Sequence, residues 1–126
     1  MRIRRLSELP EFIAGDATRL RELVNPYADS SFSGRYSLAH ATLSPSRSST
    51  PHKLAAHELY YILAGRGRMH IETETVEVES GDAIEIPPGA TQWIESIGPG
   101  ELVFLCIVDP AWRPEIEEIL VSNTAN

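Results

Sequence analysis

Short apolar runs, many with polar residues at alternate positions, follow one another between Phe32 and Val108. Side chains two positions apart on a strand share a face, so this alternation indicates strands with one buried face. Turn residues separate the runs at a spacing of about 8 to 12 residues, as all-β sandwiches and barrels require. The predicted strands are Arg35–Leu43, His57–Ala64, Arg68–Glu72, Thr75–Val78, Ala83–Ile86, Gln92–Ile97 and Leu102–Val108.

The pattern changes at both ends of this region. Before it, Leu20, Leu23 and Val24 fall on one side of a helix that Asp16 could cap, and Pro26 would end it. After it, apolar residues recur at helical spacing between Pro114 and Leu120. The sequence therefore predicts a short N-terminal helix and a short C-terminal helix beside the β region.

Composition and charge limit the kinds of partner. The chain of 126 residues has 18 acidic and 11 basic side chains, a formal net charge of −7, and its basic residues form no stripe. Phosphate binding needs clustered cations, so nucleic acid is not expected. The apolar run Leu102–Val108 has only the length of a strand, so no membrane span is expected. The basic start lacks the apolar segment of a secretory leader, and the lone Cys106 cannot form an intrachain disulfide. These features predict one cytoplasmic domain over residues 1–126.

Two segments carry motif residues in a known order. His52, Glu58 and Gly65 match the first-histidine, glutamate and final-glycine positions of one cupin motif, and Gly81, Pro87 and Gly89 match a second. The chain thus resembles the cupin superfamily, and in particular the small single-domain cupins of the mannose-6-phosphate-isomerase-like group. The resemblance covers residues 35–110 and implies a double-stranded β-helix, the jelly-roll barrel of cupins. Cupins host many activities, so the fold alone implies none of them.

The chain departs from the cupin motifs at two ligand positions. Leu54 replaces the second histidine of the first motif, and Gln92 replaces the histidine of the second motif. The resemblance implies a divalent metal ion, Zn, Mn, Fe or Ni, held by His52, Glu58 and Gln92. An amide oxygen is a weaker donor than an imidazole, so this ion would bind less tightly than in a cupin with four ligands.

Strand parity extends the candidate site. The even positions from His52 to Ile62 should face one way, which puts Glu58 and Tyr60 inside the barrel and His57 outside. A carboxylate there is costly unless it is paired, bonded or metal-bound, so Glu58 is the most informative residue. His40 has even parity on the preceding strand and could supply a missing imidazole. Each candidate also has a purely structural alternative. Glu58 could be a carboxylate at the rim, and Gln92 a surface amide. His52 could be an exposed loop histidine, and His40 a hydrogen-bonded histidine of the core or surface.

These residues support three hypotheses of function. The first is a metal-binding cupin in which Glu58 and His52 are catalytic and Tyr60 and Gln92 contact a small polar metabolite, giving isomerase or lyase chemistry on a sugar-like compound. The second is a metal-free module that binds a sugar or small acid. The third is a structural cupin whose pocket is filled by Leu54 and its apolar neighbours. The exposed strand edges of a small sandwich also predict a homodimer, to which the N-terminal segment and Leu102–Val108 contribute.

Overall fold

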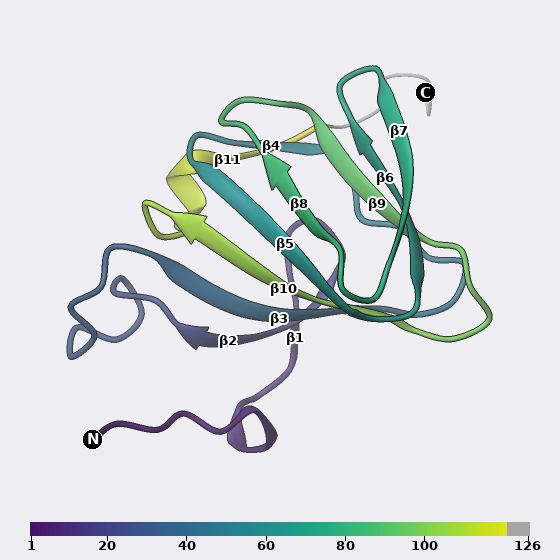
Figure 1. The fold of residues 1–126 in the computed structure, drawn as a ribbon. Coiled ribbons are helices and arrows are strands. Elements are labelled where there is room, and N and C mark those ends of the chain that lie inside the picture. Colours follow the sequence, from purple (N-terminus) through teal and green to yellow (C-terminus); the bar gives the residue numbers. More distant parts are fainter. Residues whose placement is uncertain (121–126) are drawn as a thin grey trace.

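The computed structural model describes residues 1–120, which form two antiparallel sheets that face each other (Figure 1). The six-stranded sheet has the order β1-β2-β3-β10-β5-β8. Its strands are β1 (Phe12–Ile13), β2 (Arg19–Val24), β3 (Ser37–Leu43), β10 (Leu102–Asp109), β5 (His57–Ala64) and β8 (Ala83–Ile86). The five-stranded sheet has the order β11-β4-β9-β6-β7. Its strands are β11 (Glu117–Ile119), β4 (His52–Leu54), β9 (Gln92–Ser96), β6 (Arg66–Ile71) and β7 (Glu74–Glu79). The all-β jelly-roll barrel that the sequence predicts is confirmed.

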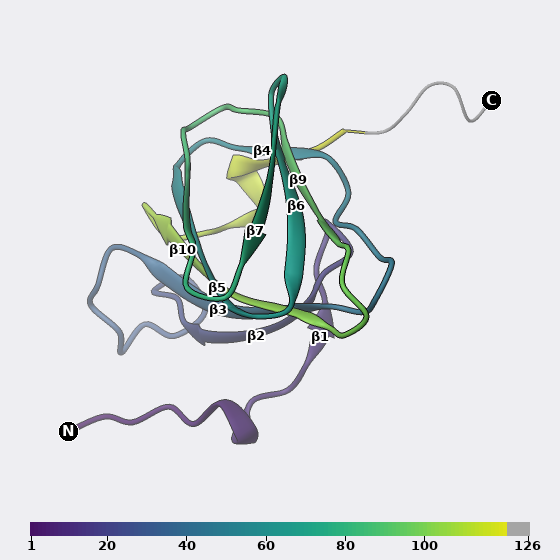
Figure 2. The same cartoon turned by 45° about the vertical axis from the view of Figure 1, so that its right-hand side comes forward.

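The space between the sheets is filled by the inward positions of the alternating strands. Figure 2 looks into this space, with β6, β7 and β9 on one side and β3, β5 and β10 on the other. The rings of Tyr60 and Phe104 lie 4.6 Å apart between their centroids. Ile62, Ile94 and Leu102 are completely buried around them. Burial of such side chains is the main stabilising contribution to a barrel of this size.

The predicted N-terminal helix is wrong, because residues 19–24 form the strand β2. Asp16 caps a turn instead of a helix: its Oδ1 accepts hydrogen bonds from the backbone N–H and the hydroxyl of Thr18. Ala17 has a φ of 75°, which turns the chain back against β1. Leu20 then pairs with Phe12 on one side and with Ala41 of β3 on the other. Pairing on both sides of β2 overrides a helical spacing of only three leucine and valine side chains.

The predicted C-terminal helix is also wrong beyond its first turn. Pro114–Ile116 form one 3₁₀ turn, and β11 follows at once. β11 pairs with β4, with Glu117 opposite Leu54 and Ile119 opposite His52. The free edge of β4 offers hydrogen-bond partners that an isolated short helix lacks, so the segment is extended. The only other helical residues among 1–120 are the 3₁₀ turn Leu6–Glu8.

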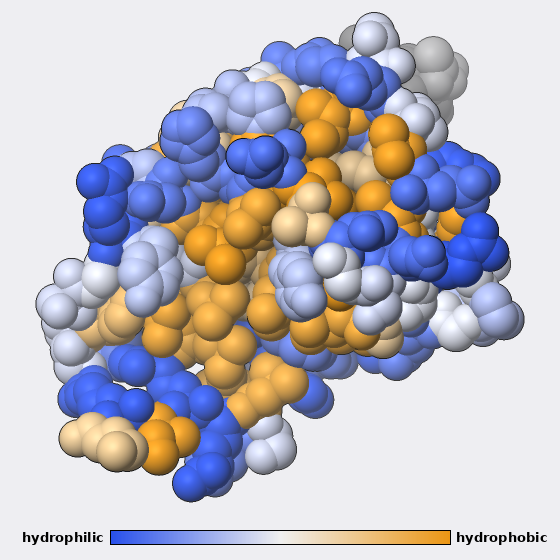
Figure 3. Space-filling view, viewed as in Figure 1, coloured by the Kyte–Doolittle hydropathy of each residue, from blue (hydrophilic) through white to orange (hydrophobic). Residues whose placement is uncertain are grey.

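The outer face of the six-stranded sheet is apolar over β5 and β10. Figure 3 shows apolar side chains gathered there, and among them Tyr61 and Leu63 are exposed. The predicted contribution of Leu102–Val108 to a homodimer through a free strand edge is wrong, because β10 pairs with β3 on one side and β5 on the other. Only the outer face of β10 is open to a partner. Among residues 1–120, no helix has the length and hydropathy that crossing a bilayer requires.

Gly65 occupies a turn that other residues cannot enter without strain. Its φ is +85°, and a Cβ there would overlap the backbone carbonyl of Glu101. Gly81 has a similar φ of +95°, but no atom of the described residues 1–120 would lie within 4 Å of a Cβ there. We expect Gly65→Ala to lower the free energy of unfolding by at least about 2 kcal/mol, and Gly81→Ala by only about 1 kcal/mol. Urea unfolding measures both losses, and the difference between them is the cost of the overlap with the Glu101 carbonyl. Equal losses for the two variants would contradict this explanation.

Candidate functional site

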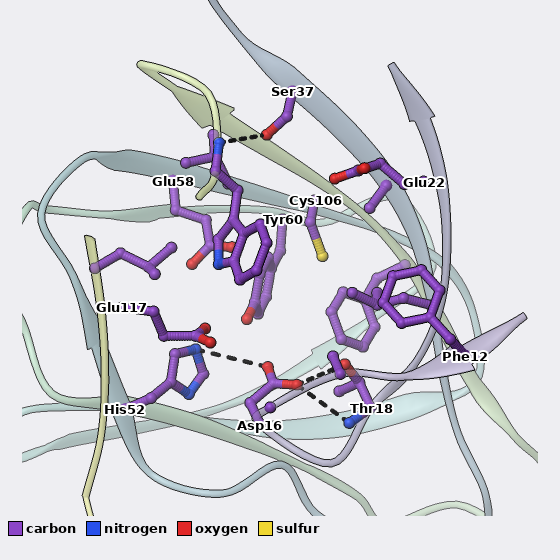
Figure 4. A pocket seen from close by; sticks show the side chains of 18 of the residues that line it. Phe12, Asp16, Thr18, Glu22, Ser37, His52, Glu58, Tyr60, Cys106 and Glu117 are labelled. Carbon is purple, nitrogen blue, oxygen red and sulfur yellow. Dashed lines mark hydrogen bonds and ion pairs between the residues drawn. The ribbon is translucent and has the colours of Figure 1, made fainter. Parts of the chain in front are cut away.

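One end of the barrel encloses a cavity of about 320 Å³ (Figure 4). The loop between β1 and β2 closes one side of it, and strands β1, β2, β3, β4, β5, β10 and β11 contribute to the remaining walls. Most of the wall is apolar, and includes Phe12, Leu20, Phe104, Cys106 and Trp112. Figure 4 shows four polar side chains close together at one end, whereas Glu22 and Ser37 lie apart from them. The four are Asp16, His52, Glu58 and Glu117.

A buried chain of hydrogen bonds holds Glu58 in the cavity wall. Glu58 and Tyr60 are two positions apart on β5 and both line the cavity, as strand parity predicts. Gln92, at the start of β9, donates a hydrogen bond from Nε2 to Glu58 Oε1 at 2.8 Å. The Tyr60 hydroxyl donates to Gln92 Oε1 at 3.1 Å. Gln92 is completely buried and lies behind Glu58 and Tyr60, outside the cavity wall.

Burial makes Glu58 an unusual carboxyl group. Only 8 % of the surface of Glu58 is exposed to solvent. The pKa of its carboxyl is raised from 4.5 to about 8, chiefly by loss of hydration. The Gln92 hydrogen bond lowers this pKa, and the nearby Asp16 and Glu117 make smaller contributions that raise it. At neutral pH the carboxyl therefore holds its proton most of the time, and can donate it to a bound molecule.

His52 presents one ring nitrogen to the same cavity. The residue is 1 % exposed, in contrast to a surface loop histidine. Its Nδ1 lies 2.7 Å from the carbonyl oxygen of Thr50, which fixes the proton of the neutral ring on Nδ1. Nε2 is then an acceptor, and it lies 3.7 Å from Oδ2 of Asp16, too far for a hydrogen bond. The Asp16 side chain is itself held in place by Thr18.

Glu117 is the third carboxyl group at this end of the cavity. It is half-buried on β11, and Figure 4 shows its carboxylate beside the ring of His52. Burial and the charge of Asp16 raise the pKa of Glu117, whereas His52 and a hydrogen bond with the Trp112 side chain lower it. Sequence reasoning did not find Asp16 or Glu117 as site residues, because neither belongs to a motif and both were expected in helices.

His40 does not join the other predicted residues. The odd positions of β3 face inward, with Ser37 and Ala39 on the cavity wall, so His40 lies on the opposite face of the sheet. There it stands opposite Arg21 of β2, and burial and that guanidinium lower the pKa of its imidazole. The orientation predicted for His40 is wrong, because the parity of β3 is set by Ala41 and Leu43 in the core. His57 is exposed, as expected.

The predicted metal ligands do not form a coordination set. Within residues 1–120, no three His, Cys, Asp or Glu side chains are grouped so that they could hold a metal ion. Gln92 turns its amide N–H toward Glu58, and its oxygen already accepts from Tyr60. The amide of Gln92 is thus committed to Glu58 and Tyr60 and offers no ligand to an ion, so the predicted set of His52, Glu58 and Gln92 does not fit the ion that the cupin motifs imply.

Comparisons with known proteins agree with this fold. Residues 39–108 match the model of the cupin domain family. An uncharacterised protein of Methanocaldococcus jannaschii is 37% identical over 115 residues, which are 90% of each chain. A solved structure described as a predicted oxalate decarboxylase from Thermotoga maritima is 25% identical, with a TM-score of 0.75 over 86% of this chain and 99% of that one. The polyketide cyclase RemF from Streptomyces resistomycificus is 22% identical, with a TM-score of 0.79 over 98% and 88%. The barrel, the matched positions and the family model together show that this chain belongs to the cupin family.

Proposed function

We propose that the barrel cavity binds a small organic molecule with an apolar body and one polar end, and that binding requires no metal ion. The observation that carries this proposal is the enclosed space of about 320 Å³ with buried polar groups at one end. Ligand sites typically have this size, an apolar lining and a few fixed polar groups. The third hypothesis, a cavity filled by Leu54, is not supported, because Leu54 is one of its walls.

The polar end suits acid–base chemistry on the bound molecule. Glu58 can supply a proton and Nε2 of His52 can accept one, so a hydroxyl or carbonyl group between them would meet both functions. Gln92 is not among the lining residues, so in this proposal it holds the Glu58 carboxyl in position in place of the substrate contact that the sequence predicts. An isomerase or lyase reaction is the enzymatic form of this proposal.

The similar structures support an enzyme of small molecules in general terms. One is described as a predicted oxalate decarboxylase and another as a polyketide cyclase, so barrels of this shape hold different substrates. Neither description favours a sugar substrate. The homodimer, the cytoplasmic location and the single domain over residues 1–126 stay predictions.

A thermal-shift screen in EDTA tests the proposal. We expect small one-ring alcohols and amines to raise the melting temperature, since a ligand at 100 times its Kd adds about 2.7 kcal/mol of stability. Zn, Mn, Fe and Ni ions, added without EDTA, should produce no comparable rise. If only the ions stabilise the protein, the metal-binding hypothesis replaces this one.

Filling the cavity provides the matched variant. Ala39 lines the cavity, whereas Ala64 is exposed at the end of β5. Ala39→Leu should remove the stabilisation by the organic molecules, because the added carbons occupy their space. Ala64→Leu should leave that stabilisation unchanged. Equal responses of the two variants would place the bound molecules outside the barrel.

A further inference from the structure

The cavity wall has an unbalanced charge composition. Among residues 1–120, four carboxyl side chains line it, and no lysine or arginine does. They are Asp16, Glu22, Glu58 and Glu117. His52 is the single basic side chain among the described lining residues, and its Nδ1 is committed to the Thr50 carbonyl. An anion that entered would lose its hydration and find no cation to offset that loss.

Acceptor atoms at the polar end lack donors. Oδ2 of Asp16, the second carboxyl oxygen of Glu58 and Nε2 of His52 have no hydrogen bond within residues 1–120. Asp16 is 8 % exposed, Glu58 8 % and His52 1 %, so bulk water reaches none of them freely. Figure 4 shows all three side chains directed at the same space. These atoms face the cavity and receive no hydrogen bond from the described residues, so they favour a ligand that brings several hydrogen-bond donors.

The wall above this end is aromatic. Phe12, Tyr60, Phe104 and Trp112 line the cavity. Aromatic faces attract cations and also pack against an apolar body. The lining therefore combines a polar end that accepts hydrogen bonds with an aromatic wall that can contact a hydrocarbon group.

We propose that the ligand of this cavity is an organic amine bound as its ammonium ion, with its N–H groups directed at Asp16, Glu58 and His52 and its hydrocarbon body against the aromatic wall. This inference rests on the proposed function, since it names the class of molecule that the cavity binds. The inference holds whether the shared proton is on the ligand nitrogen or on Glu58. A neutral amine next to the protonated Glu58 and an ammonium ion next to the Glu58 carboxylate contain the same number of protons. The carboxyl groups of the lining, with no lysine or arginine among its described residues, disfavour small dicarboxylates and phosphorylated sugars.

Three probes of one shape separate charge from fit: benzylamine, benzyl alcohol and benzoate. Their affinities are measured by calorimetry at pH 7 in EDTA. We expect benzylamine to bind at least about tenfold more tightly than benzyl alcohol, and benzoate to bind more weakly than either. Glu117→Gln should weaken benzylamine about threefold to tenfold and leave benzyl alcohol unchanged. Glu118→Gln is the matched control, because Glu118 is the exposed neighbour on β11 and the change in net charge is the same.

Each outcome decides between the two inferences. If benzyl alcohol binds and benzylamine binds no better, or if benzoate binds as tightly, the amine inference is overturned and the ligand-binding function stands. If Glu118→Gln weakens benzylamine as much as Glu117→Gln does, the attraction comes from the overall charge of −7 and the amine inference is again overturned. If none of the three probes binds, the cavity is no ligand site of this kind and both inferences fall.

Discussion

Glu58→Gln is expected to make the protein much less sensitive to alkaline pH. The pKa of Glu58 is about 8 in the folded protein, against 4.5 for the ordinary group. Between these values the native state keeps a proton that the unfolded chain has released, so stability falls by about 1.4 kcal/mol per pH unit. The contribution is fully present below pH 4.5 and is lost as pH rises through about 8. The glutamine cannot ionise, and its oxygen can still accept the hydrogen bond from Gln92.

Between pH 4.5 and pH 8.5, the free energy of unfolding of the wild type should therefore fall by roughly 4 kcal/mol more than that of Glu58→Gln. Urea unfolding at several pH values measures it, with Glu85→Gln as the control because Glu85 is exposed on β8. Some alkaline destabilisation should remain in the variant, since the pKa of Glu117 is also raised. Parallel curves for wild type and Glu58→Gln would show that the carboxyl is not desolvated by the barrel.

Gln92→Leu should cause the largest loss of stability among the site variants. Gln92 is completely buried and is the partner of two other buried groups, the Glu58 carboxyl and the Tyr60 hydroxyl. A buried polar group that loses its partner costs about 1 to 3 kcal/mol, so the variant should lose about 3 to 5 kcal/mol.

A double-mutant cycle identifies the cause of that loss. Tyr60→Phe removes the hydroxyl, so it should lower the free energy of unfolding by about 1 kcal/mol in the wild type. In the Gln92→Leu background, where the hydroxyl has already lost its partner, the same change should have no effect or should stabilise the protein. Chemical unfolding of the two single variants and the double variant supplies the coupling energy. Additive losses would mean that the two side chains do not act as one hydrogen-bonded chain.

The strands of the barrel could be predicted closely because their signal is local. His57–Ala64 and Ala83–Ile86 begin and end where alternation and turn residues place them. The alternate burial from His52 to Ile62 also follows the sequence, so Glu58 and Tyr60 were placed correctly on the inner face. Parity failed at His40, where no turn or motif fixes the register, and small alanines occupy the inward positions.

The remainder of the site could not be predicted, because it depends on pairing between distant segments. Asp16 reaches the cavity through a turn that its own side chain stabilises, and its backbone carbonyl accepts a hydrogen bond from Thr50. Glu117 reaches it only because the segment after Pro114 pairs with β4. Local spacing favoured helices at both places, and long-range pairing decided otherwise.

The segment that matches the family model, residues 39–108, contains neither Asp16 nor Glu117. The two flanks of the barrel, which attach to the short stretch from Thr50 to Leu54, complete the acidic end of the chamber. A chain cut to residues 39–108 would thus lose strands β1, β2 and β11 together with two of the four polar side chains at this end of the cavity. In this protein the choice of ligand therefore depends on segments outside the region by which its family is recognised.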